Sequence, residues 1–172
     1  SFPTRRSSDL FEPMEPAVPE KKHGSSHSLS EFESLNYLSD HGVPIPPQAI
    51  AATADAAAEE AGKLGYPVSV KIHSRDIRHK SDVGGVKLNI RDEAELRAAF
   101  AAVMDNCAKN APDAKLEGVL IKPMLKYGTE MIIGVNNDRD FGPMIMVGMG
   151  GVFVELFKDV ALAPAPLTGK QA

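Results

Sequence analysis

The stretch LGYPVSVKIHSRDIRHKSDVGGVKLNI, residues 64–90, decides the fold. Its segment PVSVKIH alternates apolar and polar residues, so that Val68, Val70 and Ile72 are predicted to face a core while Lys71 points the other way. The segment VKLNI alternates again, and its residues Val86, Leu88 and Ile90 are expected to face the core. The sequence therefore predicts two strands joined by a long, glycine-containing loop.

Capping residues predict three helices around these strands. Ser28 with Glu31 fits a capping box for a helix over about residues 29–41, and Thr53 can cap an alanine-rich helix that Gly65 closes. Asp92 with Glu95 begins a third helix, which ends before Pro112. Its predicted core face holds Leu96, Phe100, Val103 and Cys107, so the cysteine is interpreted as a core residue.

Four further strands are predicted after the third helix. They are EGVLIKPM (117–124), TEMIIGV (129–135), PMIMVGMG (143–150) and VFVELFKDV (152–160), separated by short Gly, Pro, Asn and Asp connections. Helices followed by consecutive strands indicate an α+β fold with largely antiparallel sheets and packed helices. We expect two lobes, the first over about residues 28–110 and the second starting within about 111–172.

The N-terminal residues have a different composition from the rest. Residues 1–10, SFPTRRSSDL, correspond to one reading frame of a common sequencing-library adapter and are interpreted as a non-native tail. Residues 11–27 are rich in Pro, Glu, Lys and Ser, which predicts a flexible linker. The missing initiator Met and the ending APLTGKQA lead us to expect a fragment that is truncated at the C-terminus.

Composition excludes several functional classes. The net charge of −4 and the absence of a basic stripe argue against nucleic-acid binding. The single cysteine cannot form an internal disulfide, so a reducing cytoplasm fits best. Apolar runs stay well short of the roughly 20 residues of a membrane span, which predicts no membrane association.

The loop between the first two strands contains the residues best suited to chemistry. Gly84 and Gly85 could bring backbone N–H groups close to phosphate, although a plain flexible hairpin explains them equally well. His79 could shuttle protons or attack phosphorus, or could simply be exposed to solvent. Lys71 could place a charge on a phosphate, or be a solvated strand lysine.

From about Leu29 onward, these segments resemble the ATP-grasp domain of the NDP-forming acyl-CoA synthetases, which include ADP-forming acetate–CoA ligase. The resemblance is carried by HGVPIP (41–46), by residues 64–90, by EGVLIKPMLKYGTEMIIGVNNDRDFGPMIMVGMGG (117–151) and by VELFKDVALAPAPL (154–167). It implies an ATP-grasp fold, present in part, and the reversible conversion of acyl-CoA, ADP and phosphate into acid, CoA and ATP. It also implies that a phosphoryl group passes through a histidine.

The resemblance assigns roles to individual residues. His79 would be the catalytic residue that receives the phosphoryl group and passes it to ADP. Nucleotide binding is expected at Lys71, Gly84, Gly85, Glu117, Val119, Ile121 and Glu130, of which Glu117 and the backbone near Val119 and Ile121 would bind the base. Magnesium is expected as well, with Asp138 and Glu155 as candidate ligands and the main ligands beyond Ala172.

The resemblance also implies partners for this chain. ATP or ADP and Mg²⁺ would be its ligands, and a CoA-binding acyl-CoA synthetase domain or alpha subunit would be its protein partner. We expect the chain to be inactive alone and the complete protein to be an oligomer. The alternative is a regulatory or degenerate ATP-grasp module fused to a protein lysine acetyltransferase.

Overall fold

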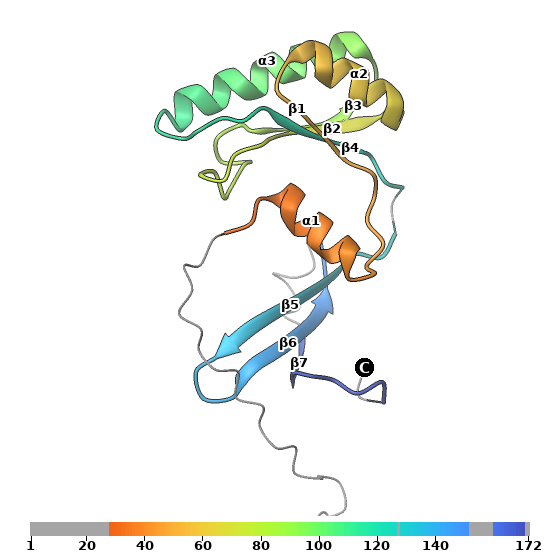
Figure 1. The fold of residues 1–172 in the computed structure, drawn as a ribbon, viewed down its shortest axis with the longest axis vertical. Coiled ribbons are helices and arrows are strands. Elements are labelled where there is room, and N and C mark those ends of the chain that lie inside the picture. The colour runs from red at the N-terminus through yellow and green to blue at the C-terminus, as the bar shows by residue number, and fades with distance from the viewer. Residues whose placement is uncertain (1–27, 127, 152–159, 171–172) are drawn as a thin grey trace, which may run out of the picture. The chain divides into compact units, whose positions relative to one another are not determined.

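The structure, a computed structural model, describes residues 28–126, 128–151 and 160–170. The described chain contains helices and strands in the order α1–β1–α2–β2–β3–α3–β4–β5–β6–β7 (Figure 1). Their bounds are α1 Glu31–Asp40, β1 Ala49–Ala51, α2 Ala54–Leu64, β2 Val68–Ile72, β3 Val86–Ile90, α3 Glu93–Asn110, β4 Val119–Pro123, β5 Met131–Asp138, β6 Gly142–Met149 and β7 Val160–Pro164. The contacts divide the chain into two compact units, with the boundary after Lys126.

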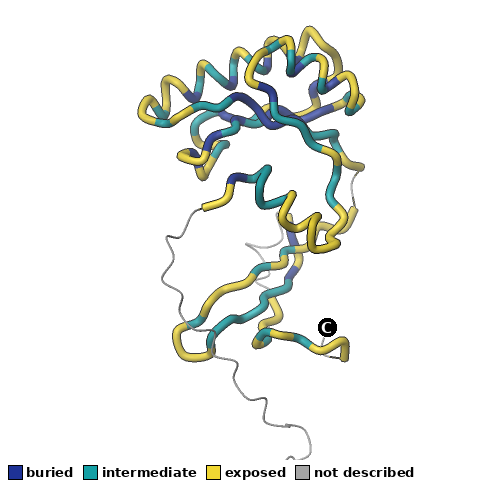
Figure 2. Tube along the Cα trace, viewed as in Figure 1, coloured by how far each residue is buried: buried dark blue, intermediate teal, exposed yellow. Residues whose placement is uncertain are grey.

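The first unit contains a four-stranded antiparallel sheet in the order β1–β4–β2–β3. Helices α2 and α3 pack on one face of this sheet, and α1 lies on the other side (Figure 1). The hydrophobic core fills the layer between the sheet and the helix pair (Figure 2). Its fully buried large side chains are Val68, Val70, Ile72, Leu96, Val103, Cys107, Val119, Leu120 and Ile121. The predicted core positions of β2 and α3, including Cys107, are thereby confirmed.

The three predicted helices are present, but the cap of the first one differs. Ser30, not Ser28, caps α1, since its Oγ accepts from the N–H of Glu33 and the Glu33 carboxylate accepts from the N–H of Ser30. Both serines have a glutamate three residues later, so the local pattern fits either. Thr53 caps α2 and Asp92 caps α3 as predicted.

Strand β3 departs from the predicted alternation. Leu88 is 55% exposed, so its predicted core position is wrong, whereas Ile90 is buried. The register with β2 shifts between Val68 and Val70, and Asn89 on β3 has a φ of 58°. A bulge adds one residue to a strand and changes which side its residues face. This explains why the period of two fails here.

The first unit extends further along the chain than the division expected at about residue 110. Strand β4 pairs with β1 and β2, so the sheet of the first unit is complete only after β4. The second unit contains an antiparallel meander in the order β5–β6–β7. The predicted strand over 152–160 falls almost wholly on residues that the structure does not describe.

The observed class is α+β with antiparallel sheets, in agreement with the prediction. Within the described residues, no helix is both long enough and apolar enough to cross a membrane.

Candidate functional site

Three lysine side chains of the first unit converge on the carboxylate of Glu31, and together with it they form what we call the lysine cluster. Lys71 Nζ lies 2.9 Å and Lys122 Nζ 2.8 Å from Glu31 Oε1, while Lys80 Nζ lies 3.0 Å from Oε2. All four side chains are largely buried, with 17% to 26% of their surface exposed. A cluster of this kind holds more positive than negative charge out of water.

The sheet explains why two of these lysines meet. Lys71 is paired with Leu120 and Ser69 with Lys122, so Lys71 and Lys122 lie on the same face of neighbouring strands β2 and β4. The opposite face is packed against α2 and α3. Glu31 is the first residue of α1, and its side chain reaches this polar face. Lys80 comes from the loop between β2 and β3.

The lysines control the ionisation of Glu31. Burial of this carboxyl raises its pKa, but hydrogen bonds from Lys122, Lys71 and Lys80 outweigh burial and lower the pKa from 4.5 to about 2. The carboxylate is therefore charged at neutral pH and compensates one of the three ammonium groups. Two positive charges remain, which is the electrostatic requirement for binding an anion such as a polyphosphate.

The loop that carries His79 is anchored on both sides of this residue. Ile77 is buried in the core, and the Asp76 carboxylate accepts from the N–H of Lys115 at 2.8 Å. After His79, Lys80 joins the lysine cluster. His79 itself is exposed, and its carbonyl accepts from the N–H of Asp82 at 3.2 Å. An anchored loop thus presents an imidazole to solvent, one residue from Lys80 of the cluster.

The two glycines of this loop serve its packing. A Cβ at Gly85 would lie 2.7 Å from Ile72 Cγ2 and 2.9 Å from Cys107 Sγ. Gly84 has a φ of 71° and lies against Asn106 on α3. Their N–H groups donate to the carbonyls of Ser81 and Lys80, so both amides are already used within the loop. This arrangement favours a structural role for Gly84 and Gly85. It argues against phosphate binding by their two backbone N–H groups.

The residues predicted to bind the base lie in and before β4. Val119 and Ile121 are fully buried, and their strand is paired on one side with β1 and on the other with β2. Their backbone groups are therefore used by the sheet. The Glu117 carboxylate pairs with Lys115 at 2.9 Å and approaches His73 Nε2 at 3.9 Å. The hydrogen bond from Lys115 lowers the pKa of Glu117.

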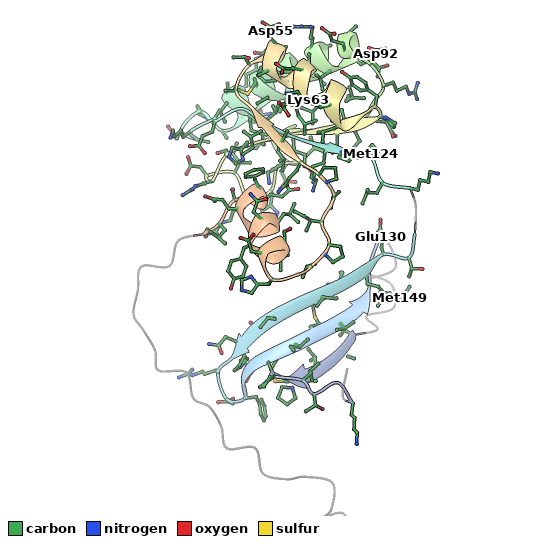
Figure 3. The ribbon with its side chains drawn as sticks, turned by 45° about the vertical axis from the view of Figure 1, so that its right-hand side comes forward. Asp55, Lys63, Asp92, Met124, Glu130 and Met149 are labelled. Atoms are coloured by element: carbon green, nitrogen blue, oxygen red, sulfur yellow. The ribbon has the colours of Figure 1, made fainter. Side chains whose placement is uncertain are left out.

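The remaining predicted site residues belong to the second unit. Glu130 is exposed just before β5, and its carbonyl accepts from the N–H of Gly150, next to Met149 on β6 (Figure 3). Asp138 Oδ1 accepts from the N–H groups of Asp140 and Phe141, and these bonds lower its pKa. Asp138 thus shapes the turn between β5 and β6.

The structure does not assemble the predicted magnesium ligands. In the described ranges, no three His, Cys, Asp or Glu side chains gather into a group that could hold a metal ion. The second candidate, Glu155, lies outside the described residues. Asp138, the candidate that the structure does describe, is therefore not part of such a group.

Sequence reasoning missed three members of the lysine cluster. Lys122 alternates with the core residues Val119 and Ile121, a signal that places it on the non-core face of its strand. Lys80 directly follows His79, but its ion pair with Glu31 joins residues 49 positions apart. Glu31 was interpreted as part of a cap. Only the three-dimensional arrangement shows that these residues meet Lys71.

Comparisons with known proteins place this arrangement in a family. The beta subunit of acetate–CoA ligase [ADP-forming] I from Pyrococcus furiosus is 44% identical over 153 residues, which are 89% of this chain and 66% of that protein. The chain therefore spans slightly less than two thirds of this curated relative.

Solved structures are similar to this chain in both sequence and fold. Acetyl-coenzyme A synthetase 1 of Ca. Korarchaeum cryptofilum, described in complex with coenzyme A and Ca-AMPCP, is 42% identical with a TM-score of 0.79, over 83% of this chain and 62% of that one. A second structure of that enzyme is described with Mg-AMPPCP and with a phosphohistidine segment pointing towards the nucleotide binding site. It is 38% identical with a TM-score of 0.66, over 83% of this chain and 60% of that one. A protein-family model described as "ATP-grasp domain" matches residues 20–172. Because this match covers most of the sequence, the resemblance is confirmed and the chain belongs to the ATP-grasp family.

Proposed function

We propose that this chain is the nucleotide-binding, phosphoryl-transferring part of an ADP-forming acid–CoA ligase. Such an enzyme converts acyl-CoA, ADP and phosphate into acid, CoA and ATP, and the reaction is reversible. The relatives named above are ADP-forming ligases or acetyl-CoA synthetases, which supports the ligase over the acetyltransferase alternative. The complete enzyme would include a CoA-binding domain or subunit, and we expect it to be oligomeric.

The lysine cluster carries this proposal. A nucleoside diphosphate or triphosphate brings several negative charges, and its binding requires cations at fixed positions. The free energy cost of burying these cations must already be offset within the protein, here by the carboxylate of Glu31. Lys71, Lys80 and Lys122 are held at one place by Glu31, with a surplus of positive charge. Mg²⁺, which the Korarchaeum complex contains, would screen the same phosphates when bound. The polyphosphate would then lie against the polar face of the first sheet.

In this proposal His79 acts as the phosphoryl carrier. A neutral imidazole nitrogen can attack phosphorus, forming an N–P bond while the P–O bond to the leaving group breaks. In the direction of ATP synthesis, the N–P bond breaks and a terminal oxygen of ADP forms the new P–O bond. The neighbouring Lys80 would stabilise negative charge on the transferred group. The exposure of His79 allows donor and acceptor to approach in turn.

Formation of an acid-labile phosphohistidine tests the role of His79. The complete enzyme, incubated with Mg²⁺ and ATP carrying a labelled γ-phosphate, should incorporate label that acid releases and alkali preserves. His79→Asn should abolish this label, whereas His41→Asn, which changes an exposed histidine at the end of α1, should retain it. If the His79→Asn enzyme is labelled as well as the parent, His79 is not the carrier.

Nucleotide titration tests the lysine cluster separately. Lys71→Gln and Lys122→Gln should each weaken ADP binding about ten-fold, because a hydrogen bond to a charged group contributes about 1.5–3 kcal/mol. Lys63→Gln is the matched control, since Lys63 is an exposed lysine of α2 that pairs with Glu59 and Glu60 (Figure 3). Equal ADP affinity in all three variants would contradict nucleotide binding at the cluster.

A further inference from the structure

A cavity of about 280 Å³ lies beside the lysine cluster in the first unit. It is formed between the start of α1 and the loop that follows β2, and its lining residues are Ser28, Leu29, Ser30, Glu31, Ser74, Arg75, Ile77, Arg78 and Lys80. Lys71 and Lys122 are not among them. The cavity therefore borders the cluster through Glu31 and Lys80 and is otherwise built from residues to which no part in nucleotide binding has been assigned.

The charged residues in the wall leave a positive excess. Three of them are cations, Arg75, Arg78 and Lys80, and one is an anion, Glu31. Lys80 is paired with Glu31, and Arg75 is paired with Glu33 next to the cavity. Arg78 makes no ion pair or hydrogen bond through its side chain with any part of the chain that the structure describes. Its guanidinium is thus available to a ligand.

Buried hydroxyl groups add donors of the kind that a phosphate needs. Ser30 and Ser74 are only 5% exposed and both line the cavity. Each Oγ accepts one backbone N–H at 3.2 Å, from Glu33 and Asp76 respectively. Neither O–H has an acceptor among the described residues, so both protons remain for a ligand. A buried donor without an acceptor is costly, and an oxyanion would remove that cost.

From these observations we propose that the cavity binds a phosphate group, as a site distinct from the one that holds the nucleotide phosphates. A guanidinium and two hydroxyl donors around a net positive cavity match a tetrahedral dianion. The volume exceeds the roughly 30 Å³ that one water occupies in the liquid, which leaves room for phosphate with its waters. Two sources supply this chemistry: orthophosphate, which is the co-substrate of the proposed reaction, and a phosphate group carried on His79, which stands between Arg78 and Lys80 in the sequence.

Titration of the complete protein with orthophosphate tests the site. We expect saturable binding, and sulfate, a dianion of the same shape, should compete for it. Arg78→Gln should weaken phosphate binding about ten-fold, while Arg91→Gln, which changes an exposed arginine next to α3, should leave it unchanged. Because Arg78 is exposed and unpaired in the described chain, its substitution should not disturb folding, and an unchanged thermal midpoint confirms this. Absence of saturation, or equal affinity in the two variants, would overturn the proposal.

Two further measurements separate this site from the nucleotide site and identify the source of the phosphate group. Orthophosphate should still bind when ADP is saturating, and its exclusion by ADP would show that the cavity is part of the nucleotide site instead. His79→Asn should leave orthophosphate affinity unchanged if free phosphate is the ligand, and labelling of His79 in the parent enzyme should lower that affinity if the carried group occupies the cavity. Since phosphohistidine formation depends on His79 and phosphate affinity on Arg78, failure of this site and failure of the proposed function give different results.

Discussion

The carboxyl group of Glu31 should make the stability of this protein depend on pH in the acid range. Its pKa is about 2 in the folded state and near 4.5 when free, so its contribution is present above pH 4.5 and is lost as the pH falls towards 2. The shift corresponds to roughly 3 kcal/mol at neutral pH. Denaturant unfolding of the parent and Glu31→Gln should therefore differ by up to that amount at pH 7, and by less than half of it at pH 3. A pH-independent difference would show that the three lysines do not set the pKa of Glu31.

The same residue shows where prediction from sequence reaches its limit. The pattern Ser-x-x-Glu occurs twice, and sequence alone favoured Ser28 with Glu31. In the structure Glu33 completes the cap and Glu31 meets lysines from β2, β4 and the intervening loop. His79 and Lys71 could be proposed together as site residues because both stand within residues 64–90. Lys122 could not be grouped with them from the sequence. It comes close to Lys71 through the pairing of β2 with β4, which joins residues far apart in the chain.

At the scale of elements, Gly85 should be required for the packing of the loop between β2 and β3. In Gly85→Ala the new methyl group would contact Ile72, Cys107 and the carbonyl of Lys80 at 2.7–2.9 Å, so we expect a loss of roughly 1–3 kcal/mol in unfolding free energy. Gly62→Ala is the control, because nothing lies within 4 Å of a Cβ there and alanine favours the interior of α2. Chemical denaturation should show destabilisation of the first variant and slight stabilisation of the second. Equal stability of both would mean that the loop can move away from α3.

Strands and helices were predictable where local signals agree with burial. Thr53 and Asp92 cap their helices as predicted, and β2 presents Val68, Val70 and Ile72 to the core, with β4 paired to it in continuous register. Strand β3 lies at the edge of the sheet and contains the bulge at Asn89, so Leu88 became exposed against the pattern. Pairing of β4 with β1 and β2 encloses Val119 and Ile121, which local sequence could not reveal. Pairing between strands that are distant in sequence thus accounts for the differences between the predicted and observed environments of these residues.

At the scale of the whole molecule, the two units should differ in local stability. The central strands β2 and β4 of the first unit are almost wholly buried beneath α2 and α3, whereas β5 of the second unit exposes 73% of Ile133 and 72% of Val135 (Figure 2). Amide hydrogens exchange most slowly where opening requires loss of a buried core. Hydrogen exchange followed by mass spectrometry should therefore show slower exchange for Val68–Ile72 and Val119–Ile121 than for Met131–Asp138.

Hydrogen exchange in the presence of a partner extends this comparison of β2 with β5. If the proposed CoA-binding domain or subunit covers the apolar residues of β5, adding it should slow exchange in Met131–Asp138. Exchange in Val68–Ile72 should stay unchanged, because this segment is already enclosed. Saturating ADP should instead protect the peptides that contain Lys71, Lys80 and Lys122. Protection of the β5 peptide by ADP alone would show that nucleotide binding involves the second unit as well, and equal exchange of β2 and β5 in the isolated chain would contradict the difference in stability inferred from burial.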